Sequence, residues 1–255
     1  MHKFIQRFRQ PKFPTDLPLC QLPSVLDVSM ARRVLVFAPH PDDEVLGCGG
    51  TLALLPSDCQ IRLVLVTDGS GGGDLPPEIG PRRRKEWAES LAHLGITDVT
   101  YLNAPDAAVA PEPIWLGLIA AEIKAFQPDW IFSPSMTDYH RDHMAIAQMV
   151  HSVCFEFACV KQLLMYEIWA PTWATHIVNI TPVVTRKREA LLLQKTSLEY
   201  GNYLQAIEGL NLYRGLYLGF PNASAEAFWI VSAARSSWRM VCHRFWLRWL
   251  NWVGI

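Results

Sequence analysis

Short apolar runs alternate with longer amphipathic segments through the first 156 residues of the chain. Four runs predict buried strands of a parallel sheet: residues 33–38, 61–67, 99–102 and 130–133. The segments between and after them predict helices: residues 45–55, 83–94, 115–126 and 143–156. This alternation predicts an α/β fold with a Rossmann-like, mostly parallel sheet flanked by helices.

The pattern is less regular in the remainder of the chain. We expect strands over residues 163–169 and 177–180 and a helix over residues 185–197. Residues 69–82 and 200–227 are expected to be loops. The chain is therefore divided into an N-terminal extension (1–30), one domain (31–225) and a C-terminal helix rich in Trp and Arg (226–255).

Composition narrows the class of protein. Half of the 255 residues are apolar and 18% are charged, which excludes a globally disordered chain. The net charge is -1, whereas a domain that binds nucleic acid is typically basic, so no nucleic-acid partner is expected. The six cysteines form no C-x-x-C pair, which is typical of free thiols in a reducing compartment. The basic N-terminus lacks the apolar core of a secretory signal, and we expect a cytoplasmic protein.

Two clusters of polar residues directly follow the first and fourth expected strands. The first is residues 39–44, Pro-His-Pro-Asp-Asp-Glu, and the second is residues 138–143, Asp-Tyr-His-Arg-Asp-His. Ligands of a doubly wound sheet bind at the carboxyl ends of its strands, so the clusters are expected to share one site. Histidine and carboxylate groups are zinc ligands, and a catalytic zinc keeps three of them and one open position. The remaining carboxylate and histidine could then act as proton acceptor and oxyanion donor.

The two clusters together resemble the PIG-L/LmbE-like family of zinc-dependent N-acetylglucosaminyl deacetylases. Further segments share the family's pattern, and the resemblance spans about residues 33–200: residues 66–70, Arg83 with Glu86, residues 101–106, and residues 166–171. The resemblance implies a hydrolase that removes an N-acetyl group from a GlcNAc-type amino sugar in a glycoconjugate.

The family's functional residues can be placed position by position. His40, Asp43 and His143 resemble the three zinc ligands. Asp42 resembles the general base, and His140 resembles the group that stabilises the oxyanion or protonates the leaving amine. The implied cofactor is Zn²⁺, with Fe²⁺ as an alternative because two histidines and one carboxylate accept both ions.

Further roles follow from the same resemblance. Arg83 and Asp106 resemble residues that hold sugar hydroxyls or an attached phosphate. Asp142 is expected to orient a histidine from behind, and Glu44 to cap the following helix and support the ligand loop. Two positions depart from the family pattern, and neither is an expected ligand: Arg141 and Asn179.

Several alternatives stay open from the sequence. The same zinc chemistry serves an amidase that cleaves another N-acyl group or a thiol-sugar conjugate. A carbohydrate-binding protein that retains the fold without turnover is a second alternative, and a membrane adaptor with an incidental metal site is a third. The expected loops 69–82 and 200–227 would set specificity, and neither the exact glycan nor the oligomeric state follows from the sequence.

The last 28 residues, 228–255, combine arginines with half of the ten tryptophans and contain no Asp or Glu. Four arginines interrupt the segment, which argues against a membrane-spanning helix. The composition fits a helix lying at a membrane surface, and it equally fits a helix packed on the domain or on a second subunit. In the first case the protein would be peripheral to the inner face of the membrane, and a lipid-linked sugar would be a natural substrate.

Overall fold

The computed structural model describes residues 22–71, 76 and 78–233. Within them, one eight-stranded sheet has the order β1-β7-β8-β6-β5-β2-β3-β4. Its strands are β1 (Ser24–Val25), β2 (Arg33–Ala38), β3 (Gln60–Thr67), β4 (Asp98–Ala104), β5 (Trp130–Pro134), β6 (Gln162–Tyr166), β7 (His176–Asn179) and β8 (Ala225–Ser232). The helices are α1 (Asp43–Leu54), α2 (Ile79–His93), α3 (Pro113–Phe126), α4 (Arg141–Val153), α5 (Val184–Leu193), α6 (Lys195–Tyr200) and α7 (Tyr203–Gly215). The expected α/β fold is thus confirmed.

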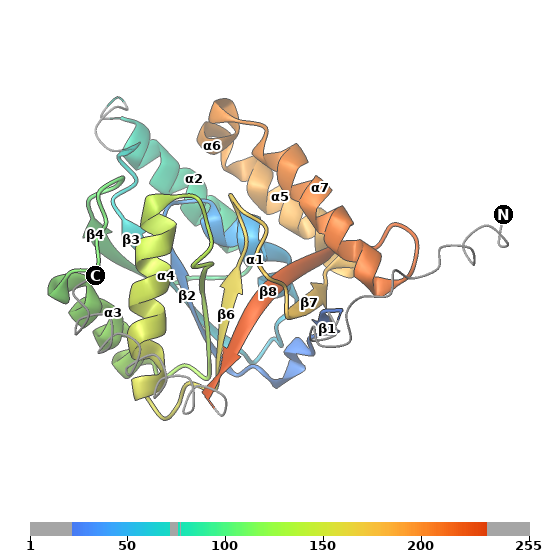
Figure 1. Ribbon diagram of the computed structural model, residues 1–255. Helices are drawn as coiled ribbons and strands as arrows, with labels where there is room; N and C mark the ends of the chain where they lie inside the picture. The colour runs from blue at the N-terminus through green and yellow to red at the C-terminus, as the bar shows by residue number, and fades with distance from the viewer. Residues whose placement is uncertain (1–21, 72–75, 77, 234–255) are drawn as a thin grey trace, which may run out of the picture.

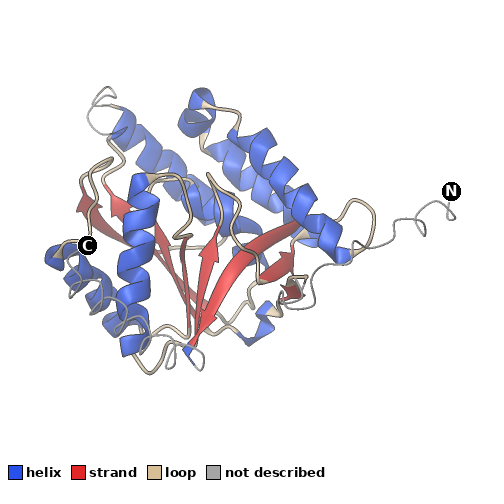
Figure 2. Cartoon of the chain, viewed as in Figure 1, coloured by secondary structure: helices blue, strands red, loops and turns tan. Residues whose placement is uncertain are grey.

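Helices cover both faces of the sheet (Figures 1 and 2). The central strand β2 shows why its sequence is apolar throughout. Val34 and Val36 point into the core shared with α1, α2, α5 and α7, whereas Leu35 and Phe37 point into the core shared with α3 and α4. Because successive side chains of a strand face opposite sides, a strand covered on both sides needs a continuous apolar run.

The carboxyl ends of the central strands meet at one edge of the sheet. Strands β4, β3, β2, β5 and β6 are parallel, each to its neighbour. The segments that follow β2, β4, β5 and β6 therefore emerge on the same side. Both polar clusters lie in these segments, and the sheet brings them together as expected.

A buried ion pair anchors helix α1 beneath this edge. Lys187 Nζ donates to Glu226 Oε1 at 2.7 Å and to the Leu46 carbonyl at 2.8 Å. Glu226 accepts hydrogen bonds from the backbone N–H groups of Gly50 and Thr51 at 2.8 and 2.7 Å. Leu46 C=O and Gly50 N–H are the two groups that bond each other in a regular helix. The ion pair therefore fixes the middle of α1, and α1 begins at Asp43 of the first polar cluster.

Three expectations for the later part of the chain need correction. Residues 200–227 are not a loop, because they contain α7 and the start of β8. The expected helix over residues 185–197 is divided into α5 and α6 at Gln194. The expected strand over 163–169 ends at Tyr166, which frees residues 167–175 to form a loop at the edge of the site.

The expected helix over residues 228–255 does not begin as a helix. Residues 225–232 form β8, which pairs antiparallel with both β6 and β7. The Phe-Trp-Ile-Val run suits a pleated, half-buried surface, and the gap between two strands provides one. Residues 234–255 lie outside the described residues, so the membrane-surface and packing interpretations both stay predictions, as does the division into domains. In the part of the chain that the structure describes, no helix has the length and apolarity to cross a bilayer.

Candidate metal centre and active site

The first polar cluster forms a tight connection from β2 into α1. Thr67 of the neighbouring strand holds this connection, because its hydroxyl donates to the Pro39 carbonyl at 2.8 Å. Asp42 has φ 129° and ψ −28°, a conformation that costs a non-glycine residue on the order of 1–3 kcal/mol. Asp43 is the first residue of α1. The strained turn places His40, Asp42 and Asp43 at the same edge of the sheet.

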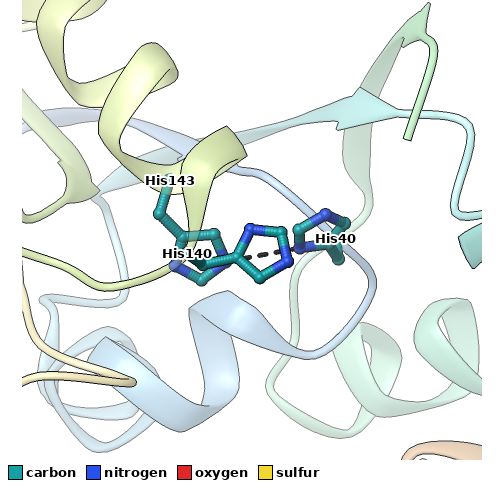
Figure 3. A group of neighbouring side chains, drawn as sticks. All are labelled: His40, His140 and His143. Carbon is teal, nitrogen blue, oxygen red and sulfur yellow. Dashed lines mark hydrogen bonds between the residues drawn. The ribbon is translucent and has the colours of Figure 1, made fainter. Parts of the chain in front are cut away.

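Three side-chain atoms from the two clusters converge. His40 Nδ1 lies 3.1 Å from Asp43 Oδ2, and His143 Nε2 lies 3.2 Å from the same oxygen. The two nitrogens are 3.3 Å apart. Figure 3 shows the imidazoles of His40, His140 and His143 grouped beside the beginning of α4, with this nitrogen pair marked by a dashed line. The residues expected to be the three metal ligands are therefore brought together.

This arrangement fits a divalent cation. Ligands about 2.0–2.1 Å from a tetrahedral zinc stand roughly 3.3–3.4 Å from one another. The three observed separations are 3.1, 3.2 and 3.3 Å. Two imidazole nitrogens and one carboxylate oxygen are a common donor set for zinc. Other groups of donor atoms within 4.8 Å also include His40, one with His140 and His143 and one with Asp106 and Asp142.

Carboxylates beside His40 Nε2 indicate which of its two nitrogens would face a bound cation. His40 Nε2 lies 3.1 Å from Asp106 Oδ1 and 3.2 Å from Asp142 Oδ2. Asp142 is buried and accepts backbone hydrogen bonds from Ala107 and Val109 at 2.8 and 3.1 Å. With Nε2 protonated toward these carboxylates, the lone pair of His40 is on Nδ1, the atom beside Asp43. Asp142 thus occupies the orienting position that the sequence analysis expected.

Asp138 lies beside the second histidine, and the sequence analysis assigned it no role. Its Oδ2 lies 3.3 Å from His143 Nδ1, although the geometry falls short of a hydrogen bond. Its Oδ1 accepts the backbone N–H of His140 at 2.9 Å. Burial lowers the pKa of His143, but Asp43 and Asp138 outweigh this effect and raise it to about 9. The signal was present in the sequence, because Asp138 begins the second cluster.

Comparison with known proteins agrees with this geometry. Residues 35–154 match the model of the family PIG-L, described as GlcNAc-PI de-N-acetylase. Over these residues the chain is similar to the PIG-L family. It is 27% identical over 159 residues to the uncharacterized deacetylase YaiS of Escherichia coli, a match covering 58% of this chain and 80% of YaiS. It is 35% identical over 86 residues to the 1D-myo-inositol 2-acetamido-2-deoxy-alpha-D-glucopyranoside deacetylase of Streptomyces avermitilis, covering 29% of each chain.

Two solved structures share this fold and differ in the activity that their names state. The N,N'-diacetylchitobiose deacetylase of Pyrococcus horikoshii superposes with a TM-score of 0.72 at 23% identity, covering 82% of this chain and 88% of that one. The 4-carboxy-2-hydroxymuconate hydratase GalB of Pseudomonas putida superposes with a TM-score of 0.69 at 19% identity, covering 78% and 96%. The fold therefore carries more than one chemistry, and the reaction must be argued from the site.

Asp42 is placed where a proton acceptor could act. It is buried and lines the cavity beside the converging ligand atoms. Burial and the charge of Asp43 raise the pKa of Asp42 to about 6, while Arg83 lowers it. The nearest guanidinium nitrogen of Arg83 is 3.7 Å from Asp42 Oδ2. At this distance the Arg83 guanidinium does not hold Asp42 tightly, so Asp42 could exchange a proton.

His140 is oriented as a donor toward the cavity. It is the N-cap residue of α4, and its Nδ1 accepts the backbone N–H of Asp142 at 3.3 Å. Burial and the nearby imidazoles of His40 and His143 lower the pKa of His140. A neutral imidazole that accepts at Nδ1 carries its proton on Nε2. His140 therefore has one N–H available for a substrate oxygen.

The remaining expected residues differ in how well the structure supports them. Arg83 and Asp106 both line the cavity. Asp106 is already engaged, because Oδ1 faces His40 and Oδ2 accepts the Gly71 N–H at 2.7 Å. Glu44 is fully buried in the first turn of α1. The supporting role expected for Glu44 stays a prediction, and burial raises its pKa to about 8.

The site opens into a cavity of about 170 Å³. Its lining is mostly charged or polar, and the exceptions include Leu46 and two aromatic residues, Trp169 and Tyr203. The sequence analysis gave neither aromatic residue a role. Trp169 follows β6 in the 167–175 loop, and Tyr203 is the first residue of α7, the helix that was expected to be a loop.

Proposed function

We propose that this protein is a zinc-dependent hydrolase that removes the N-acetyl group from a GlcNAc-type amino sugar in a glycoconjugate. The observation that carries the proposal is the convergence of His40, Asp43 and His143 within 3.1–3.3 Å, with a separate buried carboxylate, Asp42, beside them. A cation-binding group alone would need no such carboxylate. The combination supports hydrolysis rather than a structural metal site.

The chain's own residues can perform the proton transfers of amide hydrolysis. When bound, zinc lowers the pKa of a water molecule and polarises a carbonyl group. Asp42 accepts the proton of the attacking water. The His140 Nε2–H donates to the oxygen of the acetyl carbonyl as negative charge develops there. The proton held by Asp42 then completes the leaving amine, which departs as the C–N bond breaks.

Arg83 supports a polar or anionic substrate group. Its side chain is 14% exposed, and its polar contacts are long, at 3.4 Å to the Gly69 and Pro41 carbonyls and 3.7 Å to Asp42. A guanidinium with such weak contacts retains donors for a sugar hydroxyl or a phosphate. Asp106 has both oxygens engaged, so we propose that it holds His40 in place as well as facing the cavity.

The test is acetate release by the purified, zinc-loaded full chain. The substrates are N-acetylglucosamine, its oligomers and glycoconjugates, and acyclic N-acetylamines. We expect release from the sugars, loss of activity with a chelator, and restoration with Zn²⁺ or Fe²⁺. Asp42→Asn should lower kcat by about 10²–10⁴-fold while retaining the metal. Asp58→Asn, which changes an exposed aspartate, is the matched control.

Each alternative has its own outcome. Release only from acyclic or thiol-linked amides would replace the proposal by another zinc amidase. Saturable binding of sugars without turnover would make the chain a carbohydrate-binding member of its family. Activity that persists in Asp42→Asn or after removal of the metal would overturn the mechanism. A preference for lipid-linked over free sugar would support the interpretation of residues 228–255 as a membrane-surface segment.

A further inference from the structure

An aromatic wall, which consists of Trp169 and Tyr203, forms one side of the cavity. The two rings pack edge to face with centroids 5.5 Å apart and an interplanar angle of 84°. Trp169 nevertheless remains 48% exposed. An indole has a large apolar surface that contributes most when it is covered, so a ligand in the cavity that covered Trp169 would gain binding energy from this contact.

The loop that carries Trp169 is held firmly. The backbone N–H of Trp169 donates to Asp138 Oδ2 at 3.3 Å, and the same oxygen lies beside His143. Glu167 and Arg214 form a buried bidentate pair with distances of 2.9 and 2.7 Å. Thr172 closes the loop, because its N–H donates to Glu167 at 2.9 Å and its carbonyl accepts from Arg214 at 3.0 Å.

Helix α7 links the two halves of the aromatic wall. Tyr203 is its first residue, and Arg214 lies near its end. The bidentate pair of Arg214 with Glu167 therefore fixes the loop of Trp169 to the helix of Tyr203. Desolvated bidentate pairs have defined geometry, so the backbone that carries Trp169 is held in place before a ligand arrives. Trp169 differs from the exposed Trp173 of the same loop because it lines the cavity and packs against Tyr203.

The size of the cavity indicates where a ligand must extend. A volume of about 170 Å³ is below the roughly 300–1,000 Å³ typical of sites for drug-sized ligands. The acetamido group can reach the ligand cluster, but the remainder of a sugar conjugate must lie across the rim. Pyranose rings present C–H groups on their faces, and these carry partial positive charge. The electron-rich face of an indole attracts such groups and excludes water from them.

We propose that Trp169, supported by Tyr203, is the stacking platform for a pyranose ring of the substrate. This proposal rests on the proposed function and adds a selectivity determinant to it. The site then selects N-acetyl groups carried on a six-membered sugar ring over those on acyclic amines. Trp169 contacts the substrate and Tyr203 positions Trp169.

The test compares two tryptophans of one loop. Trp169→Ala removes the platform, whereas Trp173→Ala removes a side chain that is 71% exposed and absent from the cavity lining. The probes are methyl N-acetylglucosaminide and N-acetylethanolamine. We expect Trp169→Ala to raise KM for the glycoside about tenfold, with kcat, metal content and the KM of the acyclic amide changed less than twofold. Trp173→Ala should behave as wild type, and Trp169→Phe should recover most of the binding.

A binding measurement keeps the two proposals separate. Calorimetric titration of the zinc-loaded protein with methyl N-acetylglucosaminide tests stacking even if no substrate is turned over. Acetate release by wild type that is unaffected in Trp169→Ala would overturn the platform and leave the deacetylase intact. Glycoside binding that is lost in Trp169→Ala, without any turnover by wild type, would support the platform and overturn the deacetylase. Failure of wild type to bind the glycoside, or equal effects on glycoside and acyclic amide, would overturn the platform.

Discussion

Replacement of Lys187 by methionine should lower the free energy of unfolding by about 3–5 kcal/mol, the cost of breaking a buried ion pair from one side. The side chains of Lys187 and Glu226 are 4% and 0% exposed, and Nζ lies 2.7 Å from Oε1. Methionine retains most of the apolar stem. The variant therefore isolates the loss of the charge.

The magnitude follows from the groups that lose Lys187. The Glu226 carboxylate stays buried with two backbone donors but without its cation. The Leu46 carbonyl and Asn211 Oδ1 lose the donor that reaches them at 2.8 and 2.9 Å. Each buried group left unsatisfied costs about 1–3 kcal/mol, and charged groups cost more. These contributions are not additive, and they are consistent with the range given for breaking a buried pair.

The assay is urea unfolding followed by circular dichroism, with thermal unfolding as a second measure. A loss of 3–5 kcal/mol corresponds to a decrease in Tm of roughly 6–20 °C. Lys187→Met combined with Glu226→Gln removes both charges and should be more stable than Lys187→Met alone. The matched control is Lys85→Met, which breaks an exposed pair with Glu89 at 4.0 Å and should cost no more than about 0.5 kcal/mol. A Lys187→Met protein as stable as this control would refute the reasoning.

Three further predictions concern the site and the core. His140→Ala should lower kcat about 10²–10³-fold and leave the zinc content unchanged, as measured by steady-state kinetics and metal analysis; loss of zinc would instead make His140 a ligand. Burial raises the pKa of Cys154 to about 12 and that of Cys48 well above its usual value. Because only the thiolate reacts, both should resist iodoacetamide at pH 8 in the folded protein and react in urea, as read by peptide mass mapping; rapid labelling of the folded protein would contradict the burial. Gly215→Ala should destabilise the fold by several kcal/mol, since a Cβ there would collide with the Ala223 carbonyl, and an unchanged urea midpoint would show that α7 can move away.

The comparison of sequence and structure is clearest at the metal centre. The strand ends predicted that the two clusters share one site, because parallel strands bring their carboxyl ends together, and the family resemblance then singled out His40, Asp43 and His143. Asp142 could be placed behind a histidine for the same reason. The role of Glu44 could not be judged from the sequence, because its neighbour Asp43 lies beside His40 and His143 while Glu44, one helical position further, is fully buried. A one-residue step along a helix changes the direction of a side chain by about 100°.

The sequence by itself determined the layers of the fold and the chemistry of the donor atoms, since both depend on patterns a few residues long. Only the tertiary structure showed that residues 225–232 are a strand between β6 and β7, because the neighbours that make them a strand are distant in the chain. Only it placed Asp138 behind His143 and assembled Trp169 and Tyr203 into one wall. Such contacts join residues that are far apart in the chain, so a periodic pattern of a few residues does not predict them.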